Sequence, residues 1–488
     1  MKIETSHIEK DRKKNKMNVV LIKALQLLCC LSLLVLLHEA GHFGFAKMFH
    51  VRVEKFIMFF DPYFRIFSTR AKWFTRLFPY FRNNETEYGI GWIPLGGYVK
   101  IAGMVDESMD TEQMKKPAQK DEFRSQSVLK RFLILFGGVL MNLLTAWVLY
   151  SMVLFVWGRD YIPMRSIGDG FQYNEFAKEL GFCDGDIPVA VDGKEIREYA
   201  VSIYRDISNA GTVTVLRSGE EVELAMPEEH INMLTMLQMS PAFMSPIAPS
   251  IVDSVMPGSA ADEAGMEGGA RLIAVGGKEI GTWGDFDQAL TVPRQYLLAS
   301  EGCTHADSLA QRKVAAVYLN PGAEHPDTVE MTLDENYMMG VVRRMPQFDK
   351  AHQGYGIAEC IPAGLVQGWK VLSGYVNDLK YVASSEGAKS VGSFITIGSI
   401  FPASWDWQQF WMLTAFISII LAVMNILPIP GLDGGHIAFL VYEGITGRQP
   451  SDKAMEWFEK IGLGILCLLM LLALSNDVRN FILPIFGL

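Results

Sequence analysis

Four long apolar stretches divide the chain. They run over about residues 17–49, 132–157, 410–427 and 457–474. A helix needs about 20 mostly apolar residues to cross a bilayer core, and the first three stretches meet that need. The fourth has an uninterrupted apolar core of only 14 residues, IGLGILCLLMLLAL, so it can also be a buried helix. The pattern predicts a polytopic α-helical membrane protein with about four spans.

The region between the second and third spans has a different pattern. Residues 158–342 alternate in short strand-like runs, are rich in glycine, and carry 29 Asp/Glu against 12 Lys/Arg. The loop at 50–131 holds 14 Lys/Arg, against 6 in the first 20 residues. Because loops rich in Lys and Arg stay in the cytoplasm, we expect this loop to be cytoplasmic and residues 158–342 to lie on the other side.

Two segments of the acidic region resemble each other. They are AKELGFCDGDIPVAVDGKEI (177–196) and GSAADEAGMEGGARLIAVGGKEI (258–280), with their GKEI copies 84 residues apart. Each predicts a short helix ending in Gly, a glycine-rich turn, a strand and a hairpin. Both resemble PDZ domains, in which a groove between a strand and a helix binds a peptide as an added strand. The alternative is a pair of β domains that only cap the membrane part.

Composition excludes some functions. The net charge is −10 and no long basic stripe occurs, so nucleic acid is not an expected partner. Six cysteines are scattered without a C-x-x-C pair, which predicts unpaired thiols and neither a disulfide framework nor a thiolate zinc site.

The first apolar stretch ends in LLHEAGHFGF, at residues 36–45. His38, Glu39 and His42 fit H-E-x-x-H, in which residues i and i+4 share one face of a helix. Both imidazoles can then bind one Zn²⁺, with Glu39 beside the metal-bound water. Ionisable side chains inside a membrane are costly without partners, so a chance or purely structural cluster is the weaker reading.

Two histidines leave a catalytic zinc site one protein ligand short. The candidate third ligand is Asp433, in MNILPIPGLDGGH at the end of the third span. Pro428 and Pro430 break the helix there, and glycines surround the carboxylate. Irregular backbone at membrane depth requires a protein-buried or watery setting, which suits a metal ligand. The alternative is an Asp that caps the next helix.

Together, HEAGH and NILPIPGLDGG resemble the site-2 protease family of intramembrane zinc metalloproteases, in particular its bacterial RseP-like group with two PDZ domains. YGIGWIPLGGYVKIAGMVDES (88–108) resembles the membrane-associated β segment of that family, and GGVLMN (137–142) its G-x-x-x-N. VGSFITIGS (391–399) departs from it, because the family has a Gly-Pro pair there; this leaves the entry to the third span open.

The resemblance implies a domain order along the chain. The expected parts are an N-terminal tail (1–16), the first span (17–49), a cytoplasmic-side loop (50–127) with the β segment (88–108), the second span (128–157), PDZ-like domains (158–246 and 247–342), a linker with an amphipathic helix (343–405), the third span (406–428), the LDG loop with its helix (429–455), and the fourth span with a tail (456–488).

The resemblance also implies the chemistry. Zn²⁺ would be held by His38, His42 and Asp433, and Glu39 would move the proton during hydrolysis. Expected substrates are single-span proteins of the bacterial inner membrane, such as anti-sigma factors, or remnant signal peptides. The PDZ pair would lie on the periplasmic side and filter substrates by size, and its grooves could take a peptide or another ligand.

Candidate substrate-binding residues are Asn142, Asn425, Pro428, Gly96 and Gly97. The amides can stabilise an oxyanion or an unwound substrate, although helix–helix hydrogen bonding is an equal alternative for each Asn. Residues 88–99 would pair with the extended substrate as an added strand, the alternative being a surface hairpin. Residues 361–385 predict a helix on the membrane surface or, alternatively, a soluble helix.

Two other function classes compete with proteolysis. A non-catalytic PDZ scaffold with a vestigial metal site would be expected to lose Glu39 first, yet the motif is intact. A zinc transporter would need several ligand-bearing sites along a pathway, and the sequence offers one such cluster.

Overall fold

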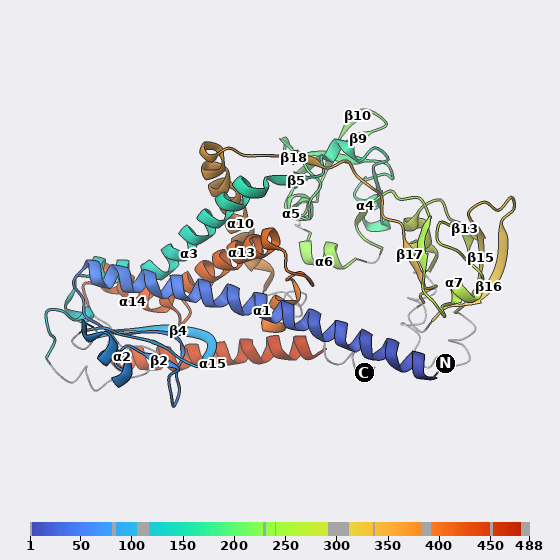
Figure 1. Ribbon diagram of the computed structural model, residues 1–488. Coiled ribbons are helices and arrows are strands. Elements are labelled where there is room, and N and C mark those ends of the chain that lie inside the picture. The colour runs from blue at the N-terminus through green and yellow to red at the C-terminus, as the bar shows by residue number, and fades with distance from the viewer. Residues whose placement is uncertain are drawn as a thin grey trace. The chain divides into compact units, whose positions relative to one another are not determined.

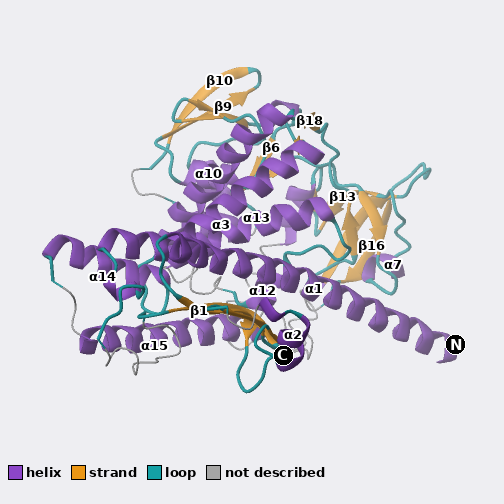
Figure 2. Cartoon of the chain, turned by 60° about the vertical axis from the view of Figure 1, so that its left-hand side comes forward, coloured by secondary structure: helices purple, strands orange, loops and turns teal. Residues whose placement is uncertain are grey.

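The computed structural model describes residues 2–80, 84–104, 117–227, 231–239, 241–290, 312–334, 337–382, 392–448 and 452–479. The chain forms two compact units. The membrane unit comprises Met1–Arg159 and Gly354–Leu488, and the β unit comprises Asp160–Gln353. Figures 1 and 2 show the helices of the first and the strands of the second.

Four helices of the membrane unit are long and apolar enough to cross a membrane, which confirms the prediction of about four spans. Their apolar portions are Met17–Met48 of α1 (Lys2–Met48), Val128–Trp157 (α3), Trp407–Ile426 (α13) and Lys460–Asp477 of α15 (Asp452–Asp477). The fourth stretch, which could also be a buried helix, has only 18% of its apolar window buried.

Helix α3 packs against α1, α13, α10 (Ile357–Val382) and α14 (Asp433–Thr446). Its contact with α1 depends on paired glycines. A Cβ on Gly41 would lie 2.2 Å from the Gly137 carbonyl oxygen, so only glycine permits this approach. Small residues let helix backbones come together in membranes in this way. The HEAGH segment is thereby pressed against the second span.

A four-stranded sheet follows α1 in the membrane unit. Its order is β2-β3-β1-β4, with bounds Phe67–Ser68, Glu87–Ile90, Val53–Phe60 and Ile93–Ile101. Strand β1 lies between β3 and β4 and pairs with β3 in parallel, so the alternative of a surface hairpin at 88–99 is wrong. Strand β4 contacts α1 and pairs with β1 on one side only within this sheet. Residues 105–108 of the expected β segment lie outside the described residues.

Helix α10 covers most of the helix predicted at 361–385, although 383–385 lie outside the described residues. The indole N–H of Trp147 in α3 donates to the Ile361 carbonyl at 2.9 Å. On α10, Ile357, Val366 and Trp369 are 67–69% exposed. Exposed apolar side chains on a helix packed against a span favour a lipid-facing position over a soluble helix.

The departure from the family pattern at 391–399 forms a short helix, α12 (Phe394–Ser399), ahead of α13; residue 391 lies outside the described part of the chain. Its first turn is bound by Asp477, which accepts from the backbone N–H groups of Ser393 and Thr396, each at 3.3 Å. A carboxylate at a helix start satisfies N–H groups that have no partner inside the helix. The entry to the third span is thus attached to the end of α15.

The β unit contains two lobes of the same topology. The first has sheet order β10-β9-β7-β8 and the second β16-β15-β13-β14, and each adds a two-stranded pair, β11-β6 and β12-β17. In chain order the strands are Phe171–Tyr173 (β6), Ile187–Val191 (β7), Lys194–Glu195 (β8), Thr212–Arg217 (β9), Glu220–Ala225 (β10), Met244–Pro246 (β11), Val252–Val255 (β12), Arg271–Val275 (β13), Lys278–Glu279 (β14), Lys313–Leu319 (β15), Asp327–Thr332 (β16) and Val341–Arg343 (β17).

The remaining short elements join these strands or flank the spans. They are α2 (Lys72–Leu77), η3 (Phe123–Ser125), β5 (Arg159–Tyr161), η4 (Met164–Ser166), α4 (Glu175–Glu179), α5 (Ser202–Ser208), α6 (Met233–Gln238), α7 (Ala260–Glu263) and β18 (Ala351–Gln353).

The internal repeat in the sequence corresponds to this repeated topology. Both predicted hairpins turn through two residues of positive φ, Asp192-Gly193 (48° and 73°) and Gly276-Gly277 (59° and 79°). Positive φ at both central positions is the requirement of a type I′ turn, which explains the D-G and G-G pairs.

Hydrogen bonds of Gln172 join the two lobes. Gln172 of the first lobe donates to Asp285 of the second at 2.9 Å and accepts from the Thr282 hydroxyl at 2.7 Å. Among the cysteines, Cys29, Cys30, Cys183, Cys360 and Cys467 are free thiols as predicted, and Cys303 lies outside the described residues.

Candidate metal centre

Two imidazoles of α1 lie one helical turn apart and face the same point. The Nε2 atoms of His38 and His42 are 3.2 Å apart, and the two rings are nearly perpendicular at 88°. Both are largely buried, with His42 at 7% exposure. The i, i+4 spacing and the glycine contact with α3 together produce this arrangement.

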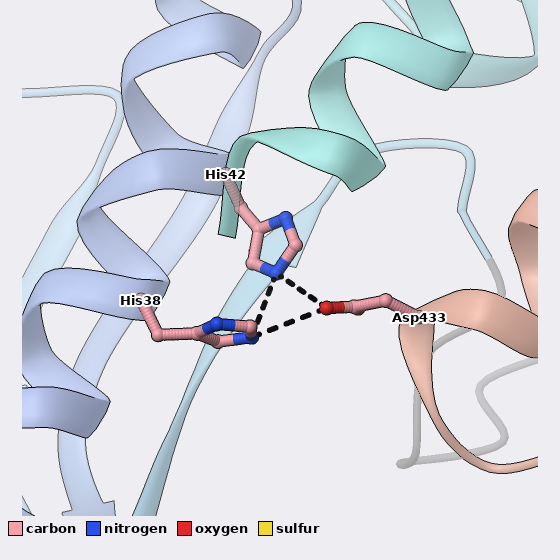
Figure 3. Close-up of side chains that lie close together, drawn as sticks. All are labelled: His38, His42 and Asp433. Atoms are coloured by element: carbon pink, nitrogen blue, oxygen red, sulfur yellow. Dashed lines mark hydrogen bonds and ion pairs between the residues drawn. The ribbon is translucent and has the colours of Figure 1, made fainter. Parts of the chain in front are cut away.

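Asp433 reaches the same point from the far end of the chain (Figure 3). Helix α13 ends at Ile426, and Leu427 before Pro428 is extended, as the residue before a proline prefers. Helix α14 then begins at Asp433. The helix N-cap is Leu432, so the alternative reading of Asp433 as an N-cap is not realised. Its carboxylate turns toward the histidines instead.

The three facing atoms form a nearly equilateral triangle. Asp433 Oδ2 lies 3.2 Å from His38 Nε2 and 3.3 Å from His42 Nε2, which closes the 3.2 Å edge between the imidazoles. Tetrahedral zinc with bonds of about 2.0–2.1 Å separates its ligand atoms by about 3.3 Å. Asp433 Oδ2 is also a buried oxygen without a hydrogen-bond donor. Both observations fit a site that can hold Zn²⁺ with three protein ligands.

A group of α3 contacts the Nδ1 atom of each imidazole and orients its ring. His42 Nδ1 lies 2.9 Å from the Ile134 carbonyl oxygen, so its N–H donates there and Nε2 keeps its lone pair for a metal. His38 Nδ1 lies 3.2 Å from the Asn142 amide nitrogen, while Asn142 Oδ1 is buried without a partner. With the side-chain amide of Asn142 turned by 180°, its oxygen accepts from the His38 N–H, and Nε2 is left free in the same way.

A glycine of α3 makes room for both rings. A Cβ on Gly138 would lie 2.5 Å from His42 Nε2 and 2.6 Å from His38 Cε1. Any side chain at this position would therefore displace the ligand atoms themselves.

Comparison with known proteins agrees with this geometry. The profile described as Peptidase family M50 matches residues 26–469. The chain belongs to peptidase family M50. It is 28% identical over 92% of its length to Protease RseP of Yersinia pestis and to a regulator of sigma E protease of Salmonella typhi, covering 96% of each. A relative from Neisseria meningitidis whose name describes it as a zinc metalloprotease is 27% identical over 92% of the chain and 97% of that protein.

This M50 chain is therefore a zinc metalloprotease of the site-2 type, working from within a membrane. The resemblance seen in the sequence is confirmed, and so is zinc as its cofactor. Among the described residues, His38, His42 and Asp433 form a cluster of three side chains that can hold a metal ion.

The other predicted site residues differ in burial and in their contacts with the metal centre. Glu39 follows His38 on α1 and is half-buried. Asn142 is fully buried against His38, and its backbone carbonyl accepts from the Ser418 hydroxyl of α13 at 2.8 Å. Asn425 is half-buried in the last turn of α13, and Pro428 is exposed between α13 and α14.

Gly96 and Gly97 lie in β4, where packing already requires glycine. A Cβ on Gly96 would lie 2.4 Å from the Phe60 ring. A Cβ on Gly97 would lie 2.9 Å from the Ile57 carbonyl oxygen and 3.4 Å from the Val35 side chain of α1. Gly97 thus lets β4 lie close to the helix that carries HEAGH.

Sequence analysis noted GGVLMN (137–142) for its resemblance to the family's G-x-x-x-N, but it did not identify the close contacts of Gly41, Gly137 and Gly138. The signal for them was the Gly-Gly pair inside an uncharged span, which indicates a close helix approach. It also missed the ion pair of Arg131 with Glu443, at 2.6 Å and with both side chains 10–12% exposed. This pair ties α14, whose first residue is Asp433, to α3.

Replacing Gly138 by alanine is expected to weaken zinc binding. The added Cβ would push both imidazoles from their positions. Loss of a group that only hydrogen-bonds to a metal ligand already lowers metal affinity by about 10–100-fold. Competition with a chromophoric chelator measures the affinity. Gly44→Ala on α1 is the matched control, because nothing lies within 4 Å of a Cβ there. Equal affinities in the two variants would show that Gly138 does not shape the site.

Proposed function

We propose that this M50 protease cleaves single-span membrane proteins, such as anti-sigma factors or remnant signal peptides, within or beside their spans. The observation that carries the proposal is the convergence of His38 and His42, from the first span, with Asp433, which follows the third span. Relatives are named as regulators of sigma E, which supports a regulatory substrate of this kind.

In the proposed mechanism His38, His42 and Asp433 hold the metal, and Glu39 is the general base. Bound Zn²⁺ supplies Lewis acidity, polarising the scissile carbonyl and lowering the pKa of water to about 7. Glu39 accepts a proton from the attacking water while the water oxygen bonds to the scissile carbonyl carbon. The same carboxyl group then gives the proton to the amine as the C–N bond breaks. Asn142 holds the His38 ring in place.

Substrate is proposed to bind beside β4. This strand has a sheet neighbour on one side and contacts the HEAGH helix, so an unwound substrate can add as the next strand. Gly96 and Gly97 allow close approach of backbones. Asn425 and Pro428, at the break between α13 and α14, would contact the substrate near the metal. Asn142 could stabilise an oxyanion only if its hydrogen bond with His38 were broken.

The two lobes of the β unit are proposed to be PDZ domains at 158–246 and 247–342, facing the periplasm while the spans lie in the bacterial inner membrane. Their shared topology and the acidic composition of the region support this reading. The residue boundaries expected for the other parts of the chain remain predictions. As a size filter, the pair would admit substrates already trimmed of bulky ectodomains, and its grooves would engage peptides.

Two alternatives are less well supported. A non-catalytic scaffold needs no metal triangle, yet the three ligand atoms lie at zinc-like separations. A zinc transporter needs further sites along a pathway, and across the described ranges one metal-type cluster is found.

The proposal is tested by incubating the purified protein in proteoliposomes with a single-span model substrate. Cleavage should stop after chelation and return with added Zn²⁺. Mass spectrometry of the fragments should locate the cut within or next to the span. Cuts confined to soluble loops would refute intramembrane cleavage while leaving zinc proteolysis intact.

Removing the β unit is expected to broaden substrate choice. Strand β5 pairs with β18, so the chain enters and leaves the unit at neighbouring points and a short linker can replace Asp160–Gln353. The truncated protein should cleave substrates that keep an intact ectodomain, which the full chain refuses. The same deletion carrying Glu39→Gln is the control for contaminating proteases. A truncated protein that binds zinc, cleaves trimmed substrate and still refuses the intact one would argue against a filter.

A further inference from the structure

The segment from Arg70 to Tyr80 has an unusual composition for an exposed connection. It reads RAKWFTRLFPY, with three basic residues, five large apolar or aromatic residues and no acidic residue. Trp73, Leu77 and Tyr80 are 62%, 67% and 83% exposed. Large apolar side chains that gather on a surface mark a site of interaction rather than a soluble face.

Aromatic contacts with Phe67 attach this segment to the sheet, and one of them is made by Trp73 at 6.0 Å between ring centres. Phe74 of α2 is half-buried, and its ring centre lies 5.0 Å from that of Phe67 in β2 and 4.9 Å from that of Phe78. The helix is thereby fixed with Trp73 and Leu77 directed outward. The basic side chains Lys72 and Arg76 are also exposed.

The contacts of Arg70 set the height of the segment along the first span. Its guanidinium donates to the Glu85 carbonyl oxygen at 3.3 Å, and the Glu85 carboxylate lies 3.6 Å from Lys47 Nζ. Lys47 is in the last turn of α1. The segment therefore begins level with the end of the first span, where the bilayer meets water.

We propose that Arg70–Tyr80, which we call the interfacial segment, binds an anionic lipid surface. Aromatic rings favour the headgroup level of a bilayer, and Lys and Arg near it attract anionic lipids. Because α1 spans the membrane, the lipid headgroups already lie at the level of this segment. An acidic peptide, the alternative occupant, would have to come from a separate molecule. The inference uses the membrane embedding of the chain and the proposed cytoplasmic side of the loop, not the proteolytic step.

The physical consequence concerns the sheet. The segment connects β2 to β3, and β3 pairs with β1, which in turn pairs with β4. Anchoring it on the lipid surface would fix the depth of β4 against α1.

The test places a fluorophore on the segment in the full-length protein. Leu77→Cys, with the six native cysteines replaced, is labelled and reconstituted in nanodiscs of phosphatidylcholine containing about one third phosphatidylglycerol. Quenching by lipids with a nitroxide near the headgroup reports contact. We expect strong quenching, and stronger quenching by labelled phosphatidylglycerol than by labelled phosphatidylcholine, by about five-fold or more.

The charge contribution is tested with two triple variants of equal charge change. Arg70→Gln, Lys72→Gln and Arg76→Gln together should bring the quenching ratio of the two lipids close to one. Arg165→Gln, Lys194→Gln and Arg197→Gln, at exposed sites of the β unit, should leave it unchanged. Zinc content and cleavage of the model substrate show that both variants are folded.

Three results would overturn the proposal. With the three basic residues intact, the label at position 77 could remain unquenched by both lipids, which would place the segment in water. The lipid preference could survive removal of the three charges. The label could respond only when a single-span substrate with an acidic cytoplasmic tail is added, which would assign the surface to substrate instead.

Discussion

Glu39→Gln is expected to lower the rate of substrate cleavage by about 10²–10⁴-fold, the contribution of a positioned general base. Glutamine has the shape of glutamate but cannot take the proton of the attacking water. Zinc content should remain near that of the unmodified protein, because the three proposed ligands are untouched. Initial cleavage rates of a single-span substrate and elemental analysis of the same preparation measure both quantities.

The control removes a carboxylate elsewhere. Glu175 in the β unit is an exposed residue of α4, and Glu175→Gln should leave cleavage and zinc unchanged. Turnover of Glu39→Gln at the unmodified rate would remove Glu39 from the reaction. Loss of zinc together with activity would make Glu39 a ligand instead of a base.

Local pattern was sufficient for those features that depend on neighbouring residues. Apolar length predicted the four spans, the repeated GKEI runs predicted the two hairpins, and H-E-x-x-H predicted two imidazoles on one helix face. Each of these follows from backbone geometry over a few residues. The sequence therefore predicts them without knowledge of the rest of the fold.

Features that join distant segments were not predictable in the same way. A surface hairpin was the alternative for residues 88–99, but β1 lies between β3 and β4 and pairs in parallel with β3, with Lys55 opposite Glu87. The support of His42 by the Ile134 carbonyl depends on a backbone atom that has no sequence signature. The pairing of Arg131 with Glu443 requires knowing that α14 returns to α3.

The sequence identified Asp433 as a candidate metal ligand, but it did not predict the direction in which its carboxylate points. Two prolines and three glycines indicated an irregular backbone around a carboxylate, and a helix cap was an equally good explanation. The structure separates the two because Leu432 occupies the cap position and the carboxylate faces the imidazoles. Its role as a ligand is open to direct measurement.

Asp433→Ala is expected to lose both zinc and activity. Removing one of three protein ligands should weaken zinc binding by more than the 10–100-fold that loss of an outer-shell partner costs. It should also leave Nε2 of His38 and of His42 facing each other at 3.2 Å with no anion beside them. Zinc per protein after dialysis against a weak chelator is the measurement, with His38→Ala as the reference for a lost ligand.

Asp433→Asn separates charge from shape at this position. The amide oxygen can still reach the metal but brings no negative charge, so zinc affinity should fall between those of the unmodified protein and Asp433→Ala. His436→Ala is the matched control, because His436 lies one turn farther along α14 and on the same side as Asp433. It should keep its zinc. If Asp433→Ala retains full zinc while His38→Ala loses it, the third ligand lies elsewhere. Loss of zinc in His436→Ala would then identify its replacement, since α14 can offer either side chain to the pair of imidazoles.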